Sequence, residues 1–512
     1  MGILLRPLDR SSGVTLLDQL CEQVSLLIER GILKPGMRLP SCRSLARQLG
    51  VSCNTVVGAY NNLLNSGLLE SRPRRGYFVH PQAAANRCGA PAQGGQGPGR
   101  PSSRPLFEIL PPALQTGVCR TIERPANWSR YPYPFVCNQT DVSRFSLAEW
   151  RKCCYQVLNR HHATLVSSDQ IDSDCDDLVE QIRCRLLPRR GIQARPEEIL
   201  VTAGAQQAIF LCAMLLGGAQ RRIAVEDPCY PDGRNIFQQF FGEVRPIGVD
   251  REGLVCDRRL HGCHLVYVTP NHQFPTSVRL SPERRERLLE SADRDGLVIV
   301  EDDYDCETDF DPSILPALRA DRRGDRVIYI GSLSKSHSPG VRIGYLVASP
   351  DFIAEARALR GMMIRQPPPF MQLAVAQFIR VGHYDALITR LQRIYRRRRQ
   401  LALQALTRLF PEMQVVSGPG STNFLVTAAA GTDLTGLVPQ ALQAGVVIEP
   451  VDACYADPAA GRHRFRIGVS SIPARRIQAG LERLRTVCDG YLEGGNRAAG
   501  VTAPARSSGT RS

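Results

Sequence analysis

Lys335 is one of only three lysines in the 512 residues of the chain, and it lies in the run GSLSKSHSPGVRIGY. Arginine supplies almost all of the remaining positive charge, so a lysine here suggests chemistry that arginine cannot perform. An amine can lose its proton and attack an aldehyde to form a Schiff base, whereas a guanidinium stays protonated at any biological pH. Ser332, Ser334 and Arg342 in the same run offer hydroxyls and a fixed cation suited to a phosphate. The run therefore indicates a pyridoxal-phosphate site.

The stretch TAGAQQAIF (202–210) places small residues immediately before a helical pattern. At the start of a helix the backbone N–H groups lack intrahelical acceptors, and the helix dipole favours negative charge. We therefore expect the N–H groups of Gly204, Ala205 and Gln206 to point at an anion such as the cofactor phosphate.

Three further stretches offer groups that suit the cofactor ring and its ligand. Tyr230, in VEDPCYPDGRN, is an aromatic plate on which a pyridine ring can stack. Asp302 ends a predicted strand in VIVEDDYDCE, and its carboxylate would keep the pyridine nitrogen protonated, which makes the ring an electron sink. Tyr304 follows two residues later and would bring a phenol near the ring hydroxyl. Arg466, in RFRIGVS, is suited to bind the carboxylate of a substrate or effector.

Each of these residues alone also has a purely structural interpretation. Tyr230 could be a core aromatic, Asp302 a surface cap, and Arg342 and Arg466 members of ordinary ion pairs. The ordered set favours the cofactor site, because the structural interpretation requires several unrelated coincidences.

The elements that would position these residues alternate between short apolar runs and amphipathic helical stretches across 105–490. RRIAVED, HLVYVTP, GLVIVEDD and RVIYIGS are typical of buried strands. Buried strands that alternate with helices predict an α/β domain with a mostly parallel sheet covered on both faces.

The N-terminal 80 residues have a different pattern. We expect helices over Leu16–Glu29, from Pro40-Ser41 to Leu49 and over Asn54–Asn65, with Ser41 and Ser52 as N-caps. The stretch LLESRPRRGYFV then predicts a β-hairpin. Two short helices joined by a glycine turn and followed by such a hairpin are typical of a winged helix-turn-helix that binds double-stranded DNA.

The composition bounds the remaining possibilities. The formal net charge is +15, and residues 1–80 hold ten Lys/Arg against five Asp/Glu, so the basic excess is densest there. The segment 81–104 is rich in Gly, Pro, Ala and Ser and is expected to be a flexible linker, and 491–512 a disordered tail. Seventeen scattered cysteines, with no membrane span and no signal peptide, indicate a cytoplasmic protein with reduced thiols. Cys256, Cys263 and His264 are too few ligands for zinc, so we expect no metal site.

The run LPSCRSLARQLGVSCNTVVGAYNNLLNSGLLESRPRRGYFV resembles the winged helix-turn-helix of the GntR family over its whole length. Many relatives carry arginine where this chain has Cys53. The alternative for this region is a helical bundle that only packs. The resemblance implies a set of residues that face the duplex, namely Arg43, Ser52, Asn54 and Thr55, with Arg74, Arg75 and Gly76 on the wing.

Residues 105–490 resemble the fold-type I aminotransferases, and together with the N-terminal module the chain resembles the MocR branch of GntR regulators. In that branch an aminotransferase-like domain senses a ligand. The resemblance implies a homodimer with pyridoxal 5'-phosphate bound between subunits. It also implies roles by position: Lys335 forms the Schiff base, Asp302 and Tyr304 contact the pyridine nitrogen and the ring hydroxyl, Tyr230 stacks on the ring, Ala205, Gln206, Ser332 and Arg342 hold the phosphate, and Arg466 binds the effector carboxylate.

Two stretches depart from the aminotransferase pattern. TPNHQFPTS (269–277) resembles the loop that ends in Asn-Pro-Thr-Gly, but Phe274 occupies the place of the asparagine and cannot hydrogen-bond the ring oxygen. LVSSDQIDSDCDD (165–177) stands where relatives have Gly-Tyr-Gly-Asp-Pro, which normally helps to shape the ligand pocket. Both changes favour a sensor with an unusual effector.

Three functions follow from these patterns. The first is a transcriptional regulator in which a small amine or amino-acid effector reacts at Lys335 and changes the arrangement of the domains. The second is an active aminotransferase with an appended DNA-binding module, and the third is a binding domain without cofactor. The basic run RLQRIYRRRRQ (390–400) is interpreted as a solvated helix face, with a supplementary phosphate contact as the alternative.

Overall fold

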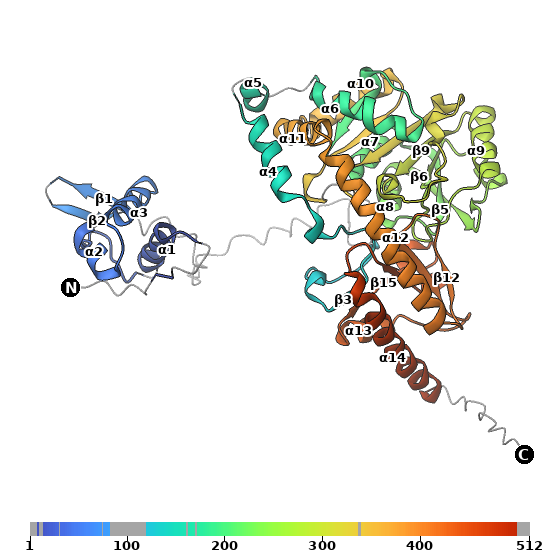
Figure 1. The fold of residues 1–512 in the computed structure, drawn as a ribbon. Coiled ribbons are helices and arrows are strands. Elements are labelled where there is room, and N and C mark those ends of the chain that lie inside the picture. The colour runs from blue at the N-terminus through green and yellow to red at the C-terminus, as the bar shows by residue number, and fades with distance from the viewer. Residues whose placement is uncertain are drawn as a thin grey trace, which may run out of the picture. The chain divides into compact units, whose positions relative to one another are not determined.

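The computed structural model describes residues 8–9, 14–29, 31–73, 75–81, 119–159, 162–168, 172–335 and 339–498. The chain divides into two compact units, 1–109 and 110–512, each described here by itself (Figure 1). The predicted linker, apart from its first residue, and Arg74 lie outside the described residues.

The first unit is a three-helix bundle with a hairpin. Its elements are α1 (Leu16–Glu29), α2 (Cys42–Leu49), α3 (Cys53–Asn65), β1 (Leu69–Arg72) and β2 (Gly76–Val79). Ser41 and Ser52 cap α2 and α3, because their hydroxyls accept hydrogen bonds from the N–H groups of Ser44 at 3.3 Å and Thr55 at 3.1 Å. The strands are antiparallel, with Leu69 opposite Val79. The predicted winged helix-turn-helix is confirmed, with its helices close to the expected positions.

A large, mostly parallel sheet forms the centre of the second unit. Its strands are β4 (Ile199–Thr202), β5 (Gly218–Asp227), β6 (Phe241–Asp250), β7 (Gly253–Leu254), β8 (Leu265–Val268), β9 (Val298–Asp303), β10 (Val327–Ser332) and β11 (Gly344–Val347). The spatial order is β4-β11-β10-β9-β8-β5-β6-β7. The run from β10 through β9, β8 and β5 to β6 is parallel, whereas β11 is antiparallel to both of its neighbours.

Helices cover both faces of this sheet (Figure 1). On one face α7 (Ala205–Leu216), α8 (Pro231–Phe240) and α10 (Pro350–Ile364) pack against strand residues such as Val225, Tyr267 and Ile330. On the other, Val266 and Ile299 pack against α9 (Pro282–Asp295). Further along that core lie α4 (Leu147–Val157), α5 (Ala163–Ser167), α6 (Asp176–Gln181), α11 (Pro369–Arg380) and the first half of α12 (His383–Leu409). The predicted α/β class is confirmed.

A second, antiparallel sheet in the order β12-β13-β16-β15 lies in the C-terminal part of the unit. Its strands are β12 (Gln414–Val416), β13 (Asn423–Thr427), β15 (Glu449–Pro450) and β16 (Arg464–Gly468). α13 (Leu437–Gln443), α14 (Ala474–Ala498) and a small pair, β3 (Tyr133–Pro134) with β14 (Val446–Val447), complete this region.

Two expectations about this region are corrected. The tail was expected from residue 491, but α14 continues to Ala498. Tyr491 and Leu492 pack on the apolar core formed by the antiparallel sheet and α14, and the Tyr491 hydroxyl donates to the Asp433 carbonyl at 3.0 Å. The basic run on α12 is only partly a solvated face. Arg398 is 2% exposed and donates to Asp141 and the Ser470 carbonyl.

No helix among the described residues is both long and apolar enough to cross a membrane.

Candidate cofactor and effector site

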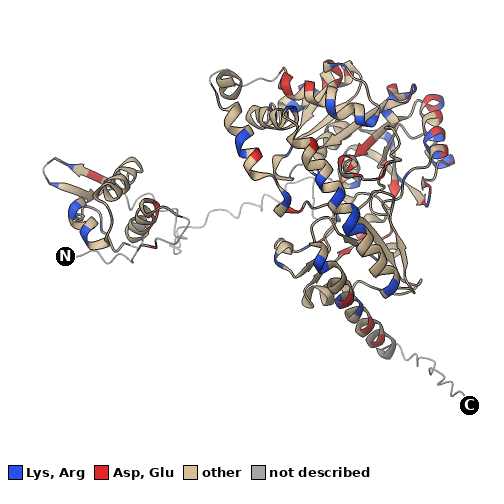
Figure 2. Ribbon diagram, viewed as in Figure 1, with Lys and Arg blue, Asp and Glu red and all other residues tan. Residues whose placement is uncertain are grey.

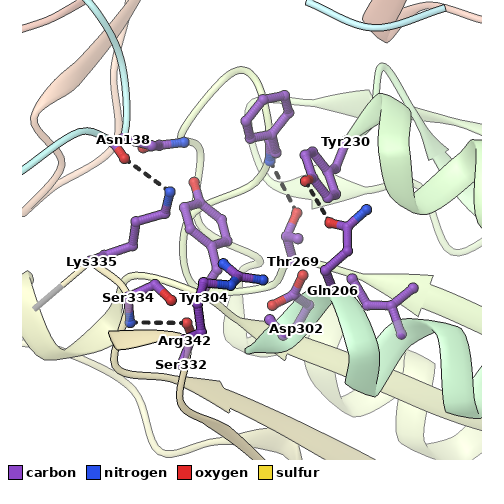
Figure 3. A pocket seen from close by; sticks show the side chains of 13 residues that line it. Asn138, Gln206, Tyr230, Thr269, Asp302, Tyr304, Ser332, Ser334, Lys335 and Arg342 are labelled. Atoms are coloured by element: carbon purple, nitrogen blue, oxygen red, sulfur yellow. Dashed lines mark hydrogen bonds between the residues drawn. The ribbon is translucent and has the colours of Figure 1, made fainter. Parts of the chain in front are cut away.

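The carboxyl ends of the parallel strands meet at one edge of the large sheet, and the predicted site residues gather there. In the strand register Ser332 lies opposite Gly344, and Gly344 lies opposite Thr202, so the ends of β10 and β4 and the start of β11 form one row. A cavity of about 230 Å³ opens beside this row (Figure 3). The residues that line it are Asn138, Ala205, Gln206, Ile209, Tyr230, Thr269, Phe274, Asp302, Tyr304, Ser332, Ser334, Lys335 and Arg342.

Lys335 follows β10 and extends into this cavity, where its Nζ donates to the carbonyl of Asn138 at 2.9 Å (Figure 3). Burial, together with the positive charge of Arg124, lowers the pKa of the amine to about 8. A lysine with this pKa has a far larger neutral fraction near physiological pH than an ordinary lysine, and a neutral amine is the form that attacks an aldehyde.

Asp302 is buried at the end of β9, with one carboxylate oxygen bonded and the other free. The hydroxyl of Tyr267 donates to Oδ2 at 2.7 Å, whereas buried Oδ1 has no hydrogen-bond partner among the described residues. Burial raises the pKa of Asp302 to about 7. An added cation beside Oδ1 would lower this pKa and stabilise the carboxylate.

Two more buried oxygens at the cavity, the hydroxyls of Tyr304 and Ser334, lack a partner within the residues that the structure describes. Tyr230 contributes its ring, while its hydroxyl donates to Gln206 at 2.9 Å and to Asp232 at 3.0 Å. Buried polar groups are normally hydrogen-bonded, so these oxygens around one cavity suit a polar ligand.

The start of α7 closes the cavity with a glycine that cannot be replaced without strain. Gly204 has φ +87°, and a Cβ built there would lie 2.9 Å from Nη2 of Arg342. That nitrogen donates to the Ala203 carbonyl at 3.1 Å, which holds the guanidinium against the first turn of the helix. The first N–H groups of α7, the Arg342 cation and Ser332 therefore surround one small space that suits an anion.

Phe274 closes the cavity from the side where the aminotransferase pattern has asparagine. Its ring lies edge-on to Tyr230, with 5.3 Å between centroids, and the guanidinium of Arg466 lies 4.2 Å from its centroid. Arg466 is 1% exposed, and no described residue forms a hydrogen bond with its Nε or Nη2. These two nitrogens form one edge of the planar guanidinium, which is the geometry that binds a carboxylate through two hydrogen bonds.

Comparison with known proteins agrees with this geometry. Residues 16–79 match the family of bacterial regulatory proteins called gntR, and residues 170–484 match aminotransferase class I and II. The chain is 38% identical over 471 residues to the HTH-type transcriptional regulator TauR of Rhodobacter capsulatus, covering 92% of this chain and 96% of that protein. The probable rhizopine catabolism regulatory protein MocR of Rhizobium meliloti is 30% identical over 403 residues, covering 77% and 78%. The chain belongs to the MocR branch of GntR-type transcriptional regulators.

The second unit of this MocR-type regulator has the aminotransferase fold. A kynurenine aminotransferase from Pyrococcus horikoshii superposes with a TM-score of 0.65 at 23% identity, covering 70% of this chain and 91% of that one. The chain is thus a DNA-binding transcriptional regulator with an aminotransferase-like domain.

The winged helix-turn-helix of this MocR-type regulator carries exposed basic side chains. Figure 2 shows Lys and Arg along α2 and on the wing. Arg43, Asn54 and Arg75 are exposed, as is Gly76, whose φ of +99° starts β2. Ser52 is exposed too, but its hydroxyl is engaged by Thr55, which donates its backbone N–H at 3.1 Å.

Several residues at the site lie in stretches that the sequence analysis did not single out. Asn138 touches Lys335 from a segment nearly two hundred residues upstream. Thr269 begins the stretch 269–277 but was not itself expected at the site, and its hydroxyl accepts the Phe274 N–H at 3.0 Å. Glu449 and Arg124 lie beside Arg466, and no local motif marks either of them. The altered loop contributes Asp174, which binds Arg357, Arg360 and the N–H of Val201 and does not line the cavity.

The described residues contain no cluster of three or more His, Cys, Asp or Glu side chains that could hold a metal ion. Cys256 and Cys263 belong to the core under α9, and Nδ1 of His264 accepts the Arg222 N–H at 3.1 Å.

Proposed function

We propose that this MocR-type regulator binds pyridoxal 5'-phosphate at Lys335 and senses a small amine or amino-acid effector through it. The observation that carries the proposal is a set of three buried oxygens, Asp302 Oδ1, Tyr304 Oη and Ser334 Oγ, around a cavity that Lys335 enters. None of the three has a hydrogen-bond partner in the part of the chain that the structure describes. These atoms fit the cofactor's pyridine nitrogen, ring hydroxyl and phosphate in turn. The chemistry that pyridoxal phosphate supplies when bound is an aldehyde carbon at which one amine exchanges for another.

The residues of the chain have separate tasks in this proposal. Lys335 supplies the neutral amine, and Asp302 carries the negative charge that pairs with a protonated ring nitrogen. Gly204, Ala205, Gln206, Ser332 and Arg342 bind the phosphate, together with the Ser334 hydroxyl. Tyr230 packs on the ring and Tyr304 donates to its hydroxyl oxygen. The free Nε/Nη2 edge of Arg466 binds the effector carboxylate.

We expect cofactor loading to follow the pKa of Lys335. The rate at which cofactor-free protein binds pyridoxal phosphate should rise with pH, reach half of its maximum near pH 8 and level off about one unit higher, because the amine is half neutral at its pKa and almost fully neutral a unit above it. An unperturbed lysine would give a rate that keeps rising to about pH 10.4. The measurement is the rate of appearance of the visible absorbance of the bound cofactor. A rate that still climbs between about pH 9 and about pH 10 would contradict the low pKa.

We further propose that residues 1–80 form the DNA-binding domain, 81–104 the linker and 105–490 the ligand domain, working as a cytoplasmic homodimer. Exposed apolar side chains support a second copy: Leu147 is 66% exposed, Tyr155 80% and Met362 79%. A dimer presents two DNA-binding domains, so we expect a paired operator site on double-stranded DNA. Arg43, Ser52, Asn54, Thr55, Arg74, Arg75 and Gly76 are the residues proposed to contact it.

Arg43→Ala should weaken operator binding by about tenfold, because an exposed arginine at a helix start can bind a phosphate or a guanine edge. If the contact is to phosphate, the slope of log affinity against log salt should fall by about one. Arg397→Ala is the matched control, since Arg397 is exposed on α12 and the solvated-face interpretation predicts no change there. Fluorescence anisotropy of labelled operator over a range of salt concentrations measures both. Unchanged affinity in Arg43→Ala would contradict the proposed DNA-binding surface, and weakened binding in Arg397→Ala would support the supplementary contact.

The regulator and the enzyme are distinguished by turnover. Wild-type protein loaded with cofactor and mixed with amino acids should change its absorbance and its operator affinity, without sustained production of a new amino acid from an added keto acid. Phe274 is the reason, because it offers no hydrogen bond to the ring oxygen. Sustained turnover would favour the aminotransferase alternative, and the absence of any absorbance band after loading would favour the domain without cofactor.

A further inference from the structure

Next to the cofactor cavity lies a smaller one that holds two arginines. It has a volume of about 140 Å³ and is lined by Arg124, Glu449 and Arg466 together with Lys335 and residues of the neighbouring loops. Since Lys335 lines both cavities, a ligand whose amine takes the place of the Lys335 amine at the cofactor aldehyde could extend into this second space.

Glu449 connects the two arginines but leaves both with free hydrogen-bonding capacity. Its Oε1 lies 3.5 Å from Nη1 of Arg124 and accepts the N–H of Cys137 at 3.3 Å, while Oε2 lies 3.8 Å from Nη1 of Arg466. Glu449 therefore approaches Arg466 from the Nη1 end, and the Nε/Nη2 edge has no partner in the described part of the chain. Arg124 is 39% exposed, and its contact with Glu449 is long. Two cations and one carboxylate leave one positive charge, which suits one anionic group.

Resting on the function proposed above, we propose that Arg124 is a specificity-determining residue of the effector site. The effector is an amine that carries one carboxylate or sulfonate, and this anion binds the Nε/Nη2 edge of Arg466 and the guanidinium of Arg124 together. Arg124 belongs to 119–125, the described part of the ligand domain that is closest in sequence to the DNA-binding domain. Effector binding therefore fixes the segment from which the chain continues toward the DNA-binding domain.

The test uses the full chain loaded with pyridoxal phosphate and three amines of similar size: β-alanine with a carboxylate, taurine with a sulfonate and n-propylamine with no anion. Binding is followed by the change in cofactor absorbance. We expect Arg124→Ala to weaken the binding of β-alanine or taurine by about tenfold or more. The affinity for n-propylamine should change by less than about twofold, because only the anion loses a charge-assisted partner. Arg124→Lys, which keeps the charge but loses the fork, should give an intermediate loss.

Arg130→Ala is the matched control, because Arg130 is an exposed arginine of the same N-terminal segment that does not line the cavity. A second readout is amide hydrogen exchange over residues 119–139, which β-alanine or taurine should slow in wild type and leave unchanged in Arg124→Ala. Whichever of β-alanine and taurine binds more tightly shows whether the site prefers a carboxylate or a sulfonate.

Two results would overturn the role of Arg124. In the first, wild type binds both anionic amines no better than n-propylamine. In the second, Arg124→Ala affects all three amines equally, as a merely structural residue would. A wild-type chain that shows no cofactor band would instead refute the proposed function itself, so the two failures are distinguishable.

Discussion

Lys335→Ala should abolish the visible absorbance that pyridoxal phosphate adds to the full chain and, with it, every response of operator binding to an added amine. The expected loss is complete, because no other amine enters the cavity among the described residues that line it. The winged helix-turn-helix should keep its affinity for DNA, since α1, α2, α3 and the wing have their own hydrophobic core. Absorbance and fluorescence anisotropy on the same sample measure both effects.

Lys152→Ala is the control for this experiment. Lys152 is exposed on α4 and lines neither of the two cavities, so its removal should leave absorbance and operator response unchanged. A Lys335→Ala protein that still shows the band and still responds to amines would contradict the assignment.

Asp302→Ala should weaken the binding of pyridoxal phosphate by about 100-fold, or ~2.7 kcal/mol, because the substitution leaves a protonated ring nitrogen buried without its carboxylate. Asp302→Asn should lose a similar amount, since an amide keeps the shape but not the charge. Equilibrium dialysis or titration of the absorbance gives the dissociation constant directly.

Tyr267→Phe provides a graded comparison at the same site. It removes the hydroxyl that donates to Asp302 Oδ2 at 2.7 Å but leaves Oδ1 and the charge in place, so a smaller loss of about tenfold is expected. Thermal unfolding of each cofactor-free variant separates lost binding from lost folding. Equal affinities in wild type and Asp302→Ala would show that this carboxylate does not face the ring nitrogen.

Much of the fold could be predicted because its determinants are local. Ser41 and Ser52 precede helical patterns and do cap their helices, and Asp302 and Ser332 end strands whose parallel direction brings them to one edge of the sheet. The antiparallel direction of β11 could not be read in advance, because GYLV has the same apolar pattern in either direction.

The parts that the sequence did not reveal depend on contacts between distant segments. Asn138, Glu449 and Arg124 reach the site from segments without a motif, so their roles become visible only when the chain is folded. A run of arginines on α12 looked solvent-exposed, but Arg398 is buried because Asp141 and the Ser470 carbonyl accept its hydrogen bonds. Charge patterns predict exposure only where no tertiary partner exists.

The most direct test of the central claim is chemical. The full chain is loaded with pyridoxal phosphate, treated with borohydride to fix any bond between the aldehyde and an amine, digested and mapped by mass spectrometry. The account predicts one modified residue, Lys335, with Lys34 and Lys152 unmodified. A modification on either of those two lysines alone, or none at all in a folded protein, would contradict it.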